Sequence, residues 1–96
     1  MDLTEFLDSV EGDSPPQNLP ETLQALWYDW KDDWDKAHRI VQEIPTAEGS
    51  WVHAYLHRKE GDLGNARYWY SRAGHPEATG DLETEWRDIV SILIDQ

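Results

Sequence analysis

Apolar residues recur three and four positions apart along most of this chain, which is the spacing of one face of an α-helix. The pattern begins in residues 2–10, where four apolar residues share one side of a short helix: Leu3, Phe6, Leu7 and Val10. A helix of two to three turns is not stable alone in water. We therefore expect it to pack on the rest of its own domain.

Helix start and stop signals divide the remainder of the chain. Residues 11–20 contain three prolines and a glycine and predict a loop. Beyond this loop, residues suited to N-caps alternate with glycine or proline at helix ends. The predicted helices span residues 20–31, 34–44, 46–60, 63–73 and 82 onward. No segment alternates with a period of two for long enough to predict a strand, so the sequence predicts an all-α fold.

The chain contains an internal repeat with a shift of 29 residues. This shift places Asp33 on Asp62, and it places Ala37 on Ala66. Matching small and large positions indicate two stacked helical hairpins, because a lone hairpin cannot bury its apolar face whereas a stacked pair shares one core. We predict a single domain overall, divided into a short N-terminal helix with a Pro-rich loop (1–19) and a helical repeat domain with a C-terminal capping helix (20–96).

The second hairpin has a recognisable arrangement of turn, small and aromatic residues. A Gly61-Asp62 turn precedes Ala66, Tyr70 and Ala73 at the start, middle and end of the following helix. This arrangement resembles the tetratricopeptide repeat family, and it is also similar to that of small bacterial proteins of tetratricopeptide-like build.

The resemblance covers residues 20–76 and implies two stacked hairpins that bind a protein or a peptide. Peptide-binding members of the carboxylate-clamp type use Asn and Lys side chains along the first helix of each hairpin. Only Lys59 is available at such a position here.

Composition narrows the possible partners. Twenty Asp and Glu against eight Lys and Arg give a net charge of −12, which argues against binding to nucleic acid or to an anionic membrane. The absence of cysteine excludes disulfides, zinc–thiolate sites and cysteine nucleophiles. The N-terminus lacks the features of a signal peptide, and no stretch has the length of a membrane span. We therefore expect a cytoplasmic protein.

The segment from Trp51 to Pro76 departs from this acidic average, with four basic residues against two acidic ones. Basic side chains beside aromatic rings are typical of binding surfaces for acidic partners. The alternative is that these cations pair with carboxylates of the same chain. The predicted contact surface consists of Tyr55, Arg58, Lys59, Arg67, Tyr68, Trp69 and Arg72.

A second candidate site lies on the same predicted helix. His53, His57 and Glu60 are spaced i, i+4 and i+7, so they share one helix face and have the donor types of a 2-His-1-carboxylate metal site. His75 is a further residue that the fold would have to bring near. The alternative is that both histidines are buried inside the hairpin and hydrogen-bonded there.

No motif for catalysis or for a cofactor is present. The chain has no glycine elbow with a serine triad, no phosphate-binding glycine loop and no paired carboxylates in an apolar setting. We therefore expect a non-enzymatic protein-interaction module without a cofactor, with a small metal-binding protein or enzyme as the alternative. Ile92 and Ile94 lie off the apolar stripe of the last helix, so both a monomer and a homodimer remain open.

Overall fold

The computed structural model describes all 96 residues and contains six helices and no strand. The all-α prediction is confirmed. The helices are α1 (Leu3–Ser9), α2 (Glu21–Trp30), α3 (Trp34–Val41), α4 (Ala47–Glu60), α5 (Leu63–Ala73) and α6 (Leu82–Ile94). None of them has both the length and the apolar character needed to cross a membrane.

One predicted helix boundary is wrong. The sequence pattern extends α3 to Ile44, whereas the helix ends at Val41 and the next residues form a tight turn. In this turn the Ile44 amide donates to the Val41 carbonyl at 3.0 Å. Pro45 disfavours the helical conformation of the residue before it, so Ile44 is kept out of the helix.

The two hairpin turns have the same backbone geometry 29 residues apart. Asp32 and Gly61 both adopt the left-handed conformation, with φ of 63° and 91°. Asp33 and Asp62 follow them, and each donates its N–H to the carbonyl five residues earlier at 2.9 Å. Each aspartate side chain then caps the next helix by accepting the backbone N–H three residues on. The repeat seen in the sequence is therefore present in both turns.

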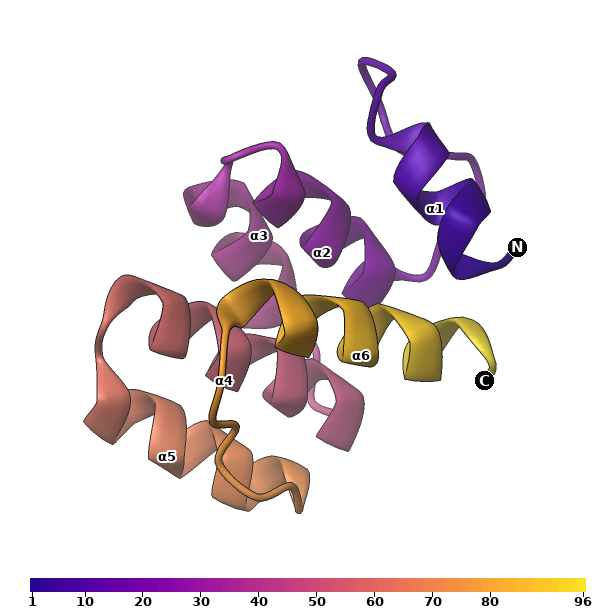
Figure 1. The fold of residues 1–96 in the computed structure, drawn as a ribbon. Helices are drawn as coiled ribbons and strands as arrows, with labels where there is room; N and C mark the ends of the chain where they lie inside the picture. The colour runs from indigo at the N-terminus through magenta and orange to yellow at the C-terminus, as the bar shows by residue number, and fades with distance from the viewer.

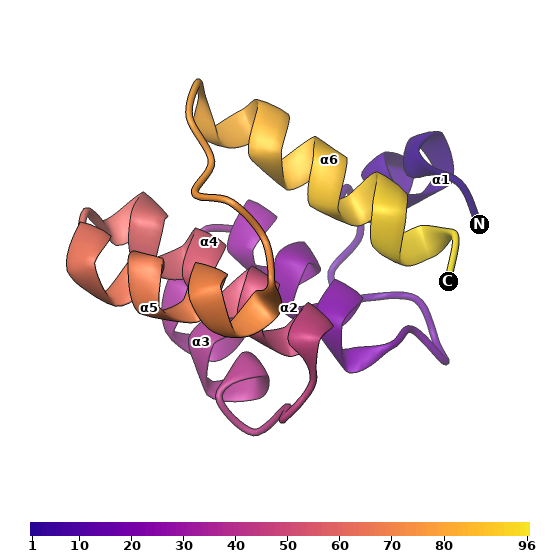
Figure 2. The ribbon, with the colours of Figure 1, turned by 90° about the horizontal axis from the view of Figure 1, so that it is seen from below.

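The helices form three layers. The pairs α2–α3 and α4–α5 pack as hairpins, and α3 packs on α4 (Figure 1). Helix α6 crosses α2 and α4 and also contacts α1. Seen from below, α6 and α1 lie on one side of α2 and α4, whereas α3 and α5 lie on the other side (Figure 2). The first helices of the two hairpins are thus covered by the C-terminal helix.

Aromatic side chains join α1 and α6 to the hairpins. The Trp86 indole packs 5.8 Å from the ring of Phe6 and donates to the Leu26 carbonyl at 3.1 Å. The Trp27 indole of α2 donates to the hydroxyl of Ser9 at 3.2 Å. Phe6 is fully buried, so the prediction that the N-terminal helix packs on its own domain is confirmed.

Candidate functional site

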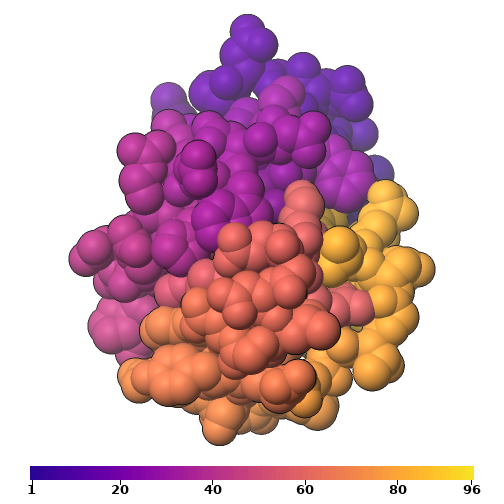
Figure 3. Space-filling view, turned by 90° about the vertical axis from the view of Figure 1, so that its left-hand side faces the viewer, coloured from indigo at the N-terminus to yellow at the C-terminus, as the bar shows by residue number.

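Helix α5 carries the exposed part of the predicted contact surface. The side chain of Arg67 is 60% exposed, and Tyr68 is 52% exposed. Arg72 is also exposed, and its guanidinium lies 5.7 Å from the ring of Tyr68 and 5.4 Å from the half-buried ring of Trp69. We call Arg67, Tyr68, Trp69 and Arg72 the α5 face. Helix α5 lies at the front of the molecule in Figure 3.

Charge sets α5 apart from the other helices. Its sequence contains two arginines and no carboxylate, whereas each of the other five helices contains at least one Asp or Glu. Arg67 forms an exposed ion pair with Glu77 at 3.0 Å. Arg72 lies within ion-pair distance of no carboxylate, and its guanidinium donates a hydrogen bond to the hydroxyl of Tyr68 at 3.1 Å.

Tyr55 and Lys59 do not belong to this exposed surface. Tyr55 is buried, and its hydroxyl donates to the Asp29 carboxylate of α2 at 3.1 Å. The Lys59 ammonium lies 2.8 Å from the other Asp29 oxygen. Burial, together with the Asp29 charge, raises the pKa of the Tyr55 hydroxyl far above its ordinary value. The prediction that both residues belong to the contact surface is therefore wrong, because Tyr55 is buried and hydrogen-bonded to Asp29 and the Lys59 ammonium neutralises the Asp29 carboxylate.

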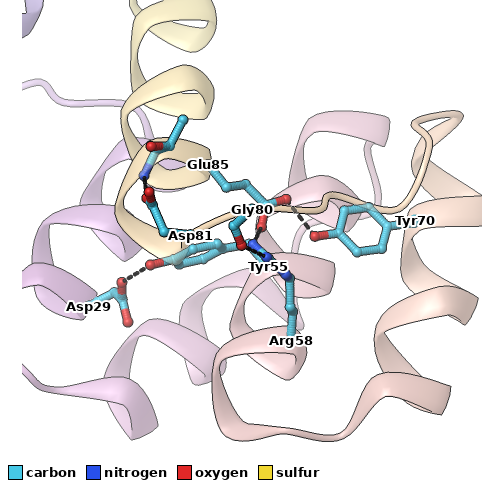
Figure 4. A network of polar contacts seen from close by, with 8 residues as sticks. Asp29, Tyr55, Arg58, Tyr70, Gly80, Asp81 and Glu85 are labelled. Carbon is cyan, nitrogen blue, oxygen red and sulfur yellow. Dashed lines mark hydrogen bonds and ion pairs between the residues drawn. The ribbon is translucent and has the colours of Figure 1, made fainter.

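Arg58 has a similar internal role. Its guanidinium pairs with Glu85 of α6 at 2.9 Å and also donates to the Gly80 carbonyl (Figure 4). The other Glu85 oxygen accepts a hydrogen bond from the Tyr70 hydroxyl. Only 14% of the Arg58 side chain is exposed, so its predicted place on a free contact surface is wrong. Arg58 and Lys59 both pair with carboxylates of their own chain, which was the alternative that the sequence left open.

The histidines gather on the other side of α4. His53 and His57 are buried, as one of the two sequence interpretations expected, and His38 of α3 lies against them. One nitrogen from each imidazole lies within 4.8 Å of the other two, and the Nε2 atoms of His38 and His53 are 3.0 Å apart. We call these three residues the histidine cluster.

Glu60 and His75 lie differently from the sequence-based expectation. Glu60 does not share a centre with both histidines: its carboxylate accepts from Nδ1 of His57 at 2.6 Å. His75 is not a member of the cluster. Its ring stacks on Trp51, with the centroids 3.8 Å apart. The proposed ligand set of His53, His57 and Glu60 is therefore wrong in its third member.

Burial keeps His38 and His53 uncharged. It lowers the pKa of His53 to about 4, and the neighbouring imidazoles of His38 and His57 act in the same direction. Burial also lowers the pKa of His38, with His57 as the next cause. At neutral pH both rings are therefore neutral, which is the form that binds metals.

Sequence reasoning missed three residues that organise these sites: Asp29, His38 and Glu85. His38 had a usable sequence signal, because it lies four residues after Trp34 and so shares one face of α3 with it. In the structure this face packs on α4, where the Trp34 indole donates to the Leu56 carbonyl. Asp29 and Glu85 had none, since twenty similar carboxylates are present. Comparison with known protein families, with curated proteins and with solved structures finds no match for this chain.

Proposed function

We propose that this protein is a non-enzymatic interaction module of tetratricopeptide-like build, which binds an acidic segment of a partner protein through the α5 face. The observation that carries the proposal is the charge of α5, which is basic and free of carboxylates in a chain of net charge −12. An acidic segment is repelled by most of this protein's surface, so attraction at one helix also fixes where it docks.

The side chains of the α5 face suit such a partner. Arg72 is exposed and is held by aromatic rings rather than by a carboxylate, so an incoming carboxylate meets a guanidinium that has no ion pair to break. The exposed pair of Arg67 with Glu77 is weak, as surface pairs are, and a partner carboxylate can replace Glu77. Tyr68 adds an exposed aromatic surface of the kind enriched at binding hot spots.

The tetratricopeptide-like build rests on the repeated turns and on matching buried positions, since Ala37 and Ala66 are both buried. Binding along the first helices of the hairpins is not expected here, because α6 covers α2 and α4. Lys59, the single clamp-type residue, is engaged by Asp29. The outer helix of the second hairpin is therefore the surface that we assign to the partner.

Affinity purification tests this proposal. The protein, carrying a tag without histidines, is used to capture partners from a lysate of its source organism, alongside the double variant Arg67→Glu/Arg72→Glu. The captured protein is then purified, and its affinity is measured by calorimetry. We expect the double variant to bind at least about tenfold more weakly, because exposed arginines at hot spots contribute more than 1 kcal/mol.

A matched control separates local contacts from overall charge. The variant Arg39→Glu/Arg87→Glu makes the same charge change on α3 and α6, where both arginines reach solvent. It should retain the partner with nearly wild-type affinity. Equal retention by both double variants would show that α5 is not the contact surface, and equal loss would show that only net charge matters.

A further inference from the structure

Two tryptophan rings hold the histidine cluster in place. Trp34 stacks on His38 with the centroids 4.8 Å apart and the planes 8° from parallel. Trp69 stacks on His53 at 3.9 Å and 17°. The imidazoles therefore cannot rotate freely, and one nitrogen of each is kept close to those of the other two.

Glu60 determines which nitrogen of His57 is available. Its carboxylate can only accept a hydrogen bond, so the proton of this 2.6 Å contact lies on Nδ1 of His57. In the neutral ring the lone pair is on the other nitrogen, Nε2. A histidine that donates one ring N–H to a carboxylate while the other nitrogen binds a metal is the usual arrangement at metal sites, where it orients the ring and raises its basicity.

The distances suit a small ion. A metal with four tetrahedral ligands at about 2.0–2.1 Å separates neighbouring nitrogens by about 3.3 Å. The Nε2 atoms of His38 and His53 are 3.0 Å apart, and one nitrogen of each of the three imidazoles lies within 4.8 Å of the other two. Movements of about 1 Å or less in the ring positions would therefore bring all three to ligand distance.

We propose that His38, His53 and His57 bind one divalent transition-metal ion of the zinc class, with Glu60 as the positioning residue behind His57. The remaining ligand position would be filled by water, since three protein ligands leave one site open in tetrahedral coordination. Before the ion enters, one proton is shared between the Nε2 atoms of His38 and His53. Ion binding moves this proton to an Nδ1 atom through solvent, so both rings stay neutral and both Nε2 lone pairs face the metal.

A second group of possible metal ligands, which also includes His57, does not compete with this assignment. His57, Glu60 and Asp62 also lie close together, but Glu60 and Asp62 are exposed and Nδ1 of His57 is already bound to Glu60. In the histidine cluster all three ligands are nitrogens and two of the three residues are buried. Imidazole ligands favour Zn²⁺, Co²⁺, Ni²⁺ and Cu²⁺ over Mg²⁺ and Ca²⁺.

Calorimetry and absorption spectroscopy on the full chain, free of any histidine tag and treated with a chelator, test the proposal. Zn²⁺ should bind with a stoichiometry of one. Co²⁺ should give the visible d–d bands of a four-coordinate site, and Zn²⁺ should displace it. Mg²⁺ serves as the probe for the many surface carboxylates and should give neither binding heat at the same concentrations nor competition with Co²⁺.

Variants at half-buried or exposed positions keep the test independent of folding. His38→Asn removes one ligand and should abolish the Co²⁺ bands. Glu60→Gln should weaken Zn²⁺ binding by about 10- to 100-fold. His75→Gln is the matched control, because His75 is the one histidine outside the cluster, and it should bind as the wild type does. Far-UV circular dichroism of each variant verifies the helices.

Two outcomes would overturn the proposal. The first is a wild-type protein that binds neither Zn²⁺ nor Co²⁺ with a stoichiometry of one, in which case the cluster is packing alone. The second is binding that persists unchanged in His38→Asn, which would place the ion elsewhere. Neither outcome affects the α5 face, whose partner binding is measured separately and in the presence of a chelator.

Discussion

Lys59→Met tests whether the Lys59 ammonium neutralises the buried Asp29 carboxylate. Asp29 is only 1% exposed and has two side-chain partners, the Tyr55 hydroxyl and the Lys59 ammonium. Methionine keeps most of the apolar stem of lysine and removes the charge. The Asp29 carboxylate then remains buried with one neutral donor. Breaking a buried ion pair in this way costs about 3–5 kcal/mol.

The expected magnitude is somewhat lower than that range. About a third of the Lys59 side chain is exposed, so solvent screens part of the interaction. We expect a loss of about 2–4 kcal/mol in the free energy of unfolding, which is a large part of the roughly 5–15 kcal/mol available to a domain. Urea unfolding followed by tryptophan fluorescence measures it, and an unchanged m-value shows that the same surface unfolds.

A double-mutant cycle isolates the charge pair. Asp29→Asn removes the buried charge while its amide oxygen can still accept from Tyr55. In that background Lys59→Met should cost less than about 1 kcal/mol. Arg67→Met is the matched control for removing an exposed cation, and it should change stability by no more than about 0.5 kcal/mol. If Lys59→Met costs equally little, or costs the same with and without the Asp29 charge, the argument for a neutralising pair is refuted.

Two further predictions concern backbone contact and alkaline stability. A Cβ at Gly49 would lie 2.7 Å from both Cγ2 and the carbonyl oxygen of Ile44, so Gly49→Ala should lower stability by about 1–3 kcal/mol in urea unfolding. Gly64→Ala meets no atom within 4 Å and should raise it by up to about 1 kcal/mol; equal effects would refute the close contact. The second prediction follows from the raised pKa of the Tyr55 and Tyr70 hydroxyls. Above about pH 10 the unfolded chain loses these two protons, whereas the folded protein keeps them. Each tyrosine therefore lowers the free energy of unfolding by up to about 1.4 kcal/mol per pH unit. The variant Tyr55→Phe/Tyr70→Phe should therefore show a smaller fall in urea midpoint between about pH 9 and 11, and an identical fall would contradict the raised pKa values.

Local features of the fold were predictable from the sequence. Helix existence depends on apolar spacing, and helix ends depend on caps within one turn, so Asp33, Asp62 and Gly61 could be placed correctly. The hairpin repeat was predictable for the same reason, because the two turns reuse the same residue types. The end of α3 was missed since Ile44 continues the apolar spacing beyond the last helical residue.

The candidate sites divide along the same line. The exposure of Arg67, Tyr68 and Arg72 could be expected, because they lie on the side of α5 away from the small residues that mark close packing. The internal ion pairs of Arg58 and Lys59 could not be predicted. Each of them requires a carboxylate on another helix, and sequence distance does not predict which carboxylate that is. Lys59 pairs with a residue 30 positions away, and Arg58 with one 27 positions away.

The sequence by itself determined six helices, two matching turns and one basic helix in an acidic chain, because periodicity, capping and charge are properties of neighbouring residues. Only the tertiary structure decided which charges are used internally and which histidines meet. The packing of α3 on α4 brings His38 to His53 and His57, and the crossing of α6 over α4 brings Glu85 to Arg58. Contacts of this kind depend on how helices pack, and packing is set by the whole core rather than by any one segment.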